Sequence, residues 1–193
     1  MNLSGYDAFD DPYAYKGTHV LKNKLGLRDT AALESFELEM SNSRATEALP
    51  DGDYDPRHYR EVHRHLFQDV YRWAGKYRTV RTSKDSNPFC FPEHIPNEMN
   101  LLFEALRTDC LPSEDASSFL ASAAAFLAEL NAIHPFREGN GRAQLAFMHL
   151  VGLRAGFPFD FSRAKSDTFL AAMIASYHGD LTPLVTELRA LLT

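Results

Sequence analysis

The segment His134–Arg142, HPFREGNGR, gathers residue types that suit phosphate chemistry. Gly139–Gly141 comes where a helix is expected to start, and glycines let a ligand approach the free N–H groups of a first helical turn. Arg142 adds a charged fork that matches phosphate oxygens, and His134 can take a proton near neutral pH. Glu138 would repel a phosphate unless it holds a cation, so we predict that it binds Mg²⁺. The pattern predicts chemistry on a phosphoryl group.

Three other interpretations of this segment are less favoured. Gly-Asn-Gly often only ends one helix and caps the next, but a capping turn has no need of His134, Glu138 and Arg142 together. A structural zinc site would need further cysteine or histidine ligands, and only His149 lies nearby. A phosphate-binding loop or dinucleotide fingerprint needs a preceding strand, whereas a helix is expected here.

The spacing of apolar residues predicts an all-α domain of six or seven helices with one small hairpin. In chain order, one helix is expected after Asp29, one after Asp55 as far as Trp73, one from Pro96, one from Ser113 to His134, one from about Gly141 to Gly156, and two that start near Ser166 and Thr182. The alternating run at 77–83 predicts the hairpin. His58, His63 and His65 lie on the second helix, and because 63 and 65 cannot share a helix face, we expect solvated or core-edge side chains rather than a metal site.

Length and composition favour one domain over residues 1–193, made of an N-terminal segment and helix (1–54), a core (55–160) and C-terminal helices (161–193). The chain is 45% hydrophobic and carries a net charge of −6. With no global positive field, direct nucleic-acid binding and membrane binding are not expected. Two cysteines, no signal peptide and no long uninterrupted apolar run predict a cytoplasmic protein.

The segment HPFREGNGR closely resembles the Fic motif, which reads His-Pro-Phe, any residue, Asp or Glu, Gly-Asn-Gly-Arg, and commonly a second Arg after two more residues. DPYAYKGTHVLKNKLGLRD, HLFQDVYRWAGKYRTV and NPFCFPEHI are also similar to segments of compact bacterial Fic proteins. The resemblance implies a Fic-type helical bundle with a β-hairpin flap at about 77–93, which agrees with the fold expected from the apolar spacing.

The resemblance implies that the protein transfers AMP from ATP to a hydroxyl side chain of a target protein. His134 would be the general base, Glu138 would hold Mg²⁺, Gly139, Asn140 and Gly141 would form an anion hole, and Arg142 would contact the β-phosphate. Phe136 would pack inward and anchor the loop. Lys84 would contact ATP or the target. The flap residues expected to dock the target are Ser83, Asp85, Asn87 and Phe89.

The chain departs from the motif at Leu145, where the family often has the second arginine, which contacts the γ-phosphate. Two alternatives therefore stay open. One is transfer of another nucleotide or of a phosphate, and the other is a non-enzymatic binding module. The family's inhibitory helix reads Ser/Thr-x-x-x-Glu-Gly/Asn, and SRATEA (43–48) lacks the final residue. We therefore expect inhibition by a separate small helical antitoxin. The resemblance to compact bacterial Fic proteins implies the toxin of a toxin–antitoxin pair, which would act on a bacterial protein such as DNA gyrase or topoisomerase IV.

Overall fold

A computed structural model describes residues 11–84, 87–111 and 113–193, and it confirms the all-α fold with one hairpin. The helices of the described chain are α1 (Thr30–Ala45), α2 (Pro56–Phe67), α3 (Ile95–Ala105), α4 (Ala116–Ile133), α5 (Asn140–Ala155), α6 (Ser166–Tyr177) and α7 (Thr182–Leu191). The hairpin pairs β1 (Ser83–Lys84) with β2 (Asn87–Pro88) in antiparallel register. A π-helical turn, Leu106–Cys110, extends α3, and a 3₁₀ turn, Phe161–Arg163, precedes α6.

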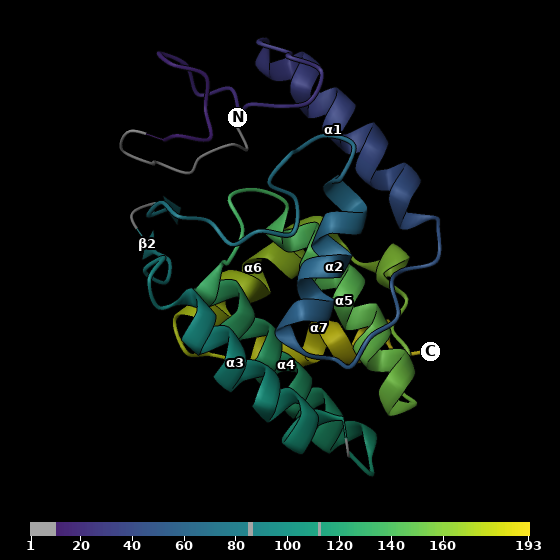
Figure 1. The fold of residues 1–193 in the computed structure, drawn as a ribbon. Helices are drawn as coiled ribbons and strands as arrows, with labels where there is room; N and C mark the ends of the chain where they lie inside the picture. The colour runs from purple at the N-terminus through teal and green to yellow at the C-terminus, as the bar shows by residue number, and fades with distance from the viewer. Residues whose placement is uncertain (1–10, 85–86, 112) are drawn as a thin grey trace.

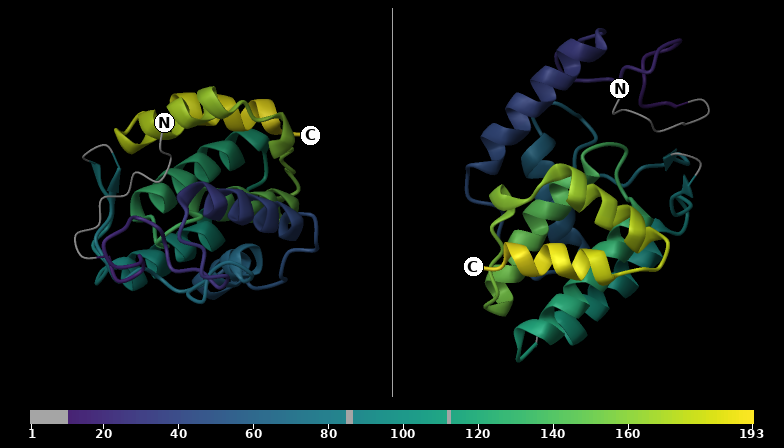
Figure 2. Two further views of the ribbon diagram at one scale, coloured as in Figure 1. Left: turned by 90° about the horizontal axis from the view of Figure 1, so that it is seen from above. Right: turned by 180° about the vertical axis from the view of Figure 1, so that it is seen from behind.

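The helices lie in three layers around α4 (Figures 1 and 2). Seen from above in Figure 2, α6 and α7 form one outer layer, α1 and α2 lie on the opposite side, and α4 and α5 lie between them. Helix α4 packs against α3, α5, α6 and α7, and α2 joins α5 to α1. The C-terminal end of α4 and the start of α5 therefore lie at the same end of the bundle, joined by the glycine-rich loop (Figure 1).

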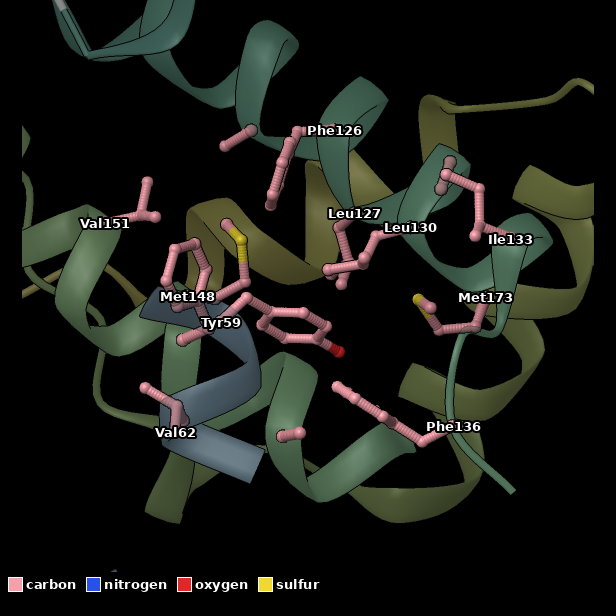
Figure 3. Close-up of a cluster of buried hydrophobic side chains, with 14 of the residues drawn as sticks. Tyr59, Val62, Phe126, Leu127, Leu130, Ile133, Phe136, Met148, Val151 and Met173 are labelled. Atoms are coloured by element: carbon pink, nitrogen blue, oxygen red, sulfur yellow. The ribbon is translucent and has the colours of Figure 1, made fainter. Parts of the chain in front are cut away.

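The core is built from the apolar faces of α2, α4 and α5, with Tyr59 and Phe136 at its centre (Figure 3). Both side chains are fully buried, and their ring centroids lie 5.3 Å apart. By length and composition α4 is apolar enough to span a bilayer, but half of it is buried inside the fold. Its apolar character is that of a core helix, since other helices surround it.

The predicted helix starts at Asp29 and Asp55 are confirmed. Their carboxylates accept the amides of Ala32 at 2.9 Å and His58 at 2.8 Å. The predicted cap at Ser113 is wrong, because the N-cap of α4 is Asp115, two residues later, and the helix begins at Ala116. One carboxylate oxygen of Asp115 accepts the backbone amides of residues 117 and 118, so it satisfies two amides of the first turn that would otherwise lack a partner.

Two predicted element lengths are also wrong. Helix α2 ends at Phe67 rather than at Trp73, because the chain turns there and buries Val70 and Tyr71. The strand predicted over 77–83 is reduced to the two residues of β1. Arg78 is buried in this segment and takes the carbonyl oxygens of Val80 and Cys90 at 2.7 and 2.6 Å, which removes ladder acceptors from both sides of the hairpin base.

Candidate active site

The loop between α4 and α5 is held in shape by Asn140. Its side-chain oxygen accepts the amide of Phe136 at 2.9 Å, and its side-chain nitrogen donates to the carbonyl of the same residue at 2.8 Å. The Phe136 ring is fully buried, as expected, and stacks on His63 with ring centroids 3.7 Å apart. Asn140 was predicted to contact nucleotide, but its side chain shapes the loop, and only its backbone amide is available to an anion.

Gly139 is the position in this loop that requires glycine. Its φ is +80°, in the left-handed region, and a Cβ there would lie 2.4 Å from the Phe67 ring. Its amide donates to Oε1 of Glu138 at 2.8 Å. The turn therefore brings backbone close to α2 and fixes the carboxylate of Glu138 beside the start of α5.

The first turn of α5 presents free amides. The first intrahelical bond runs from Ala143 to the Gly139 carbonyl at 3.0 Å, and α5 has no side-chain cap. Across residues 11–84, 87–111 and 113–193, no acceptor is found for the amides of residues 140–142. Gly141 is exposed, with open space where a Cβ would stand. This arrangement matches the predicted anion site.

His134 ends α4 in a left-handed conformation with φ 49° and ψ 62°. Its Nδ1 lies 3.3 Å from the carbonyl oxygen of Asn131, which favours the tautomer with hydrogen on Nδ1 and the lone pair on Nε2. The Phe89 ring stacks on the imidazole with centroids 3.9 Å apart and planes 12° apart. Burial lowers the pKa of His134 to about 3. The imidazole is therefore neutral at physiological pH, as a proton acceptor must be.

Arg78 is a buried cation that joins the motif loop to the base of the flap. Its guanidinium donates to the carbonyls of Ile133 and His134 at 3.1 and 2.8 Å, and to those of Val80 and Cys90. Burial lowers its pKa to about 10, so it stays charged at neutral pH. Its charge lies at the C-terminal end of α4, where the helix dipole favours a cation.

His63 of α2 supports the same loop through a hydrogen bond to the backbone of Glu138. Its Nδ1 accepts the amide of Gly75 at 2.9 Å, so the hydrogen lies on Nε2, which donates to the carbonyl of Glu138 at 2.9 Å. The side chain is fully buried, and burial lowers its pKa to about 3. The expectation of a solvated or core-edge histidine is therefore wrong for His63, because a neutral imidazole satisfies two buried backbone groups there. It is also wrong for His58, which is buried with Nε2 2.7 Å from the carbonyl oxygen of Pro50.

Glu138 and Arg142 lie side by side, with Oε1 and Nη2 3.9 Å apart. Arg142 also reaches α1: Nη1 donates to Ser41 Oγ at 2.9 Å, and Nη2 donates to Glu37. Burial, and secondarily the charge of Glu37, raises the pKa of Glu138. The side chain of Glu138 is 22% exposed, so it faces both the buried charges and the open side of the loop.

Mg²⁺ fits this donor set only with ligands from outside the chain. Within the described residues, no group of three or more His, Cys, Asp or Glu side chains could hold a metal ion. Mg²⁺ is commonly held by one or two carboxylates together with substrate phosphates and water. Glu138, beside an anion site and with its charge only partly balanced, suits that mode.

The flap contacts the motif through Phe89, which stacks on His134, and it contacts α6 through Tyr177. Ser83 pairs with Pro88 and the exposed Lys84 pairs with Asn87. The Tyr177 hydroxyl of α6 donates to the Pro88 carbonyl at 2.7 Å. Of the residues predicted to dock a target, Phe89 lies on the imidazole, Ser83 and Asn87 are half-buried in the hairpin, and Asp85 lies outside the described residues.

Sequence reasoning missed three residues of this site: Glu37, His63 and Arg78. None lies in the motif, and each contacts it through a bond between residues at least 56 positions apart. For Glu37 and His63 the sequence does carry a signal, because each falls among the apolar residues of its helix, α1 or α2, where a polar side chain is unexpected.

Comparison with known proteins agrees with this geometry. Residues 53–151 match the model of the Fic/DOC family. The chain is 51% identical over 189 residues to a probable protein adenylyltransferase, y4lH, of Sinorhizobium fredii, covering 97% of this chain and 98% of that protein. It is 33% identical over 176 residues to the probable protein adenylyltransferase Fic of Escherichia coli, covering 90% and 88%.

Among solved structures, the Bartonella tribocorum effector BepC with bound AMPPNP superposes with a TM-score of 0.84 at 27% identity, covering 94% of this chain and 96% of that one. The shared fold covers nearly the whole chain. The chain therefore belongs to the Fic/DOC family and is a protein adenylyltransferase.

Proposed function

We propose that the enzyme moves AMP from ATP to the hydroxyl of a tyrosine, threonine or serine in a bacterial protein. The observation that carries this is the pairing of a neutral imidazole with an open helix start across one short loop. At one end of the loop, His134 keeps hydrogen on Nδ1 and a lone pair on Nε2. At the other end, the amides of residues 140–142 offer positive dipoles to phosphate oxygens.

In the proposed reaction the target hydroxyl oxygen attacks the α-phosphorus of ATP. The bond between the α-phosphorus and the bridging oxygen breaks, pyrophosphate leaves, and the hydroxyl proton passes to Nε2 of His134. The amides at the start of α5 and the guanidinium of Arg142 bind the phosphate tail and offset its growing charge. Mg²⁺ held by Glu138 and phosphate oxygens would neutralise charge on the leaving pyrophosphate.

The flap is proposed to align the target. Two-residue strands leave most backbone groups of this segment outside a ladder, so an extended target segment can pair with it. Ser83, Asp85 and Asn87 would contact that segment, Lys84 would reach ATP or target, and Phe89 would keep the imidazole facing the hydroxyl. The stacking of Phe89 on His134 supports that last role.

Regulation by a separate antitoxin is part of the proposal. Glu47, the glutamate of SRATEA, pairs with Arg44 at 3.1 Å and lies 3.8 Å from Nε2 of His65, so it is engaged away from the motif. A small helical protein would supply the missing inhibitory glutamate. A toxin acting in the cytoplasm on gyrase or topoisomerase IV, without binding nucleic acid or membrane itself, is consistent with the net charge of −6.

A second candidate, transfer of a different group in the same pocket, is favoured by one observation. Leu145 is half-buried one turn after Arg142 on α5 and offers no charge to a γ-phosphate. A site that binds the terminal phosphate weakly could accept another nucleotide or a shorter phosphate chain.

The experiment compares ATP labelled at the α or the γ phosphate, incubated with Mg²⁺, bacterial lysate and the purified protein. AMP transfer predicts a protein band labelled only from α-labelled ATP. His134→Ala should abolish the band while an ATP analogue still binds, and His149→Ala, an exposed histidine on α5, should leave it unchanged. Label from the γ position alone would establish the second candidate, and equal labelling by His134→Ala would refute the proposed base.

A further inference from the structure

We propose that Glu37 of α1 is a positioning residue that sets the orientation of the Arg142 guanidinium for phosphate binding. The inference rests on the proposed role of Arg142 in the function above. Glu37 lies outside the motif, on a helix that contributes none of the residues expected to bind nucleotide or metal. Its side chain joins α1, the segment after α2 and the first turn of α5.

The carboxylate of Glu37 is buried with both oxygens in use. Its side chain is 11% exposed, Oε1 accepts Nη2 of Arg142, and Oε2 accepts the hydroxyl of Tyr71. Tyr71 is itself fixed, because it is buried and its ring stacks on Trp73 with centroids 4.2 Å apart. A buried carboxylate held from both sides can fix the direction of its partner's charge.

Three side chains hold the guanidinium of Arg142. Glu37 and Ser41 bind one N–H group on each terminal nitrogen, and the Phe67 ring lies under the guanidinium carbon at 4.7 Å. A guanidinium has five N–H groups, so three remain. Across the described chain no other hydrogen-bond acceptor for Arg142 is found, and Glu138 stands at 3.9 Å on the open side. The side chain of Arg142 is 33% exposed, so these three N–H groups are left for a phosphate.

Attachment of α1 to the bundle does not explain this carboxylate. Arg44, two turns further along α1, already pins the helix through two bonds to Asp69 after α2, at 2.6 and 3.1 Å. The apolar side chain of Leu33 is buried on the same helix. An apolar residue at position 37 would attach α1 without the desolvation of a buried charge. The charge at 37 is explained by what it does to Arg142.

The test compares Glu37→Gln with Arg44→Gln, which removes a different polar attachment of α1, to Asp69, and serves as the matched control. Binding of a non-hydrolysable ATP analogue with Mg²⁺ and the kinetics of AMP transfer are both measured, with thermal unfolding to show that the variants are folded. We expect Glu37→Gln to weaken analogue binding and raise the KM for ATP about tenfold, and Arg44→Gln to change either less than twofold. Tyr71→Phe should shift both in the same direction as Glu37→Gln, by a smaller factor.

A double-mutant cycle separates positioning from general stability. In the background Arg142→Gln, which itself weakens binding, Glu37→Gln should cause no further loss. Equal effects of Glu37→Gln and Arg44→Gln, or additive losses in the cycle, would overturn the inference and leave the function intact. A rise in activity in Glu37→Gln would also overturn it, since Glu37 would then compete with phosphate for Arg142. Because analogue binding is measured apart from transfer, failure of the reaction itself would be seen separately.

Discussion

Arg78 donates from Nε to the carbonyl oxygen of His134 at 2.8 Å, across 56 positions of the chain. The same guanidinium binds the carbonyls of Val80 and Cys90, on the two sides of the flap's base. One side chain thus fixes both the backbone of the proposed base and the segment proposed to hold the target. The two halves of the site are placed relative to each other by a buried cation.

Arg78→Lys tests this connection. Lysine keeps the charge but offers three donors from one atom, so it cannot reach four carbonyls spread over two segments. We expect the free energy of unfolding to fall by about 2–4 kcal/mol, since carbonyls are left unpaired, and kcat for AMP transfer to fall at least tenfold. Denaturant titration and initial rates measure these. Arg81→Lys, an exposed arginine of the same segment stacked on Phe91 at 3.8 Å, is the control and should change neither.

The two glycines of the motif should respond oppositely to alanine. Gly139→Ala places a Cβ 2.4 Å from the Phe67 ring at φ +80°, so we expect a loss of about 2–4 kcal/mol in unfolding free energy. Gly141→Ala meets open space inside α5 and should raise stability by up to about 1 kcal/mol through helix propensity. If phosphate lies on this face, Gly141→Ala should still weaken ATP-analogue binding in calorimetry. Unchanged binding would place the phosphate elsewhere.

His63→Phe isolates the support beneath Glu138. Phenylalanine keeps a ring against Phe136 but leaves the Gly75 amide and the Glu138 carbonyl unpaired in the core. The expected cost is about 2–4 kcal/mol of unfolding free energy, with a raised KM for ATP because the loop that carries the metal ligand loosens. His65→Phe alters a half-buried histidine of the same helix and should cost less than about 1 kcal/mol. A normal KM in His63→Phe would show that the loop needs no such support.

Stability should fall in mild acid because two histidines are buried in neutral form. Burial lowers the pKa of both His63 and His134 from 6.5 to about 3. Below pH 6.5 the unfolded chain takes up protons that the folded chain does not, so folding weakens as the pH falls towards 3. Between pH 7 and pH 5 each histidine should remove about 2 kcal/mol. Denaturant titrations at the two pH values measure the loss, which His63→Phe should roughly halve; an unchanged loss in that variant would exclude the contribution of His63.

The elements that carry the motif were predictable because their signals are local. His134 was expected to end α4, since proline follows it, and Gly156 was expected to end α5. Both are confirmed, and Gly156 takes the left-handed cap conformation. The supporting residues were not predictable in this way. In the sequence Arg78 is one of 20 lysines and arginines, and nothing in the letters around it shows that it is buried. Its partners are brought to it only when α4 packs against the segment after α2.

Leu145 is the position where the chain departs from the family motif, and it yields the last prediction. It lies three residues after Arg142 on α5, so the two side chains emerge from neighbouring turns of one helix face. Leu145→Arg would add a second cation beside the phosphate site. We expect the KM for ATP to fall about three- to tenfold, with little change in the inhibition constant of ADP as a competing ligand, because the added charge would meet the third phosphate. Leu145→Met keeps the apolar volume and should leave both unchanged; equal gains for ATP and ADP would mean that position 145 does not face the terminal phosphate.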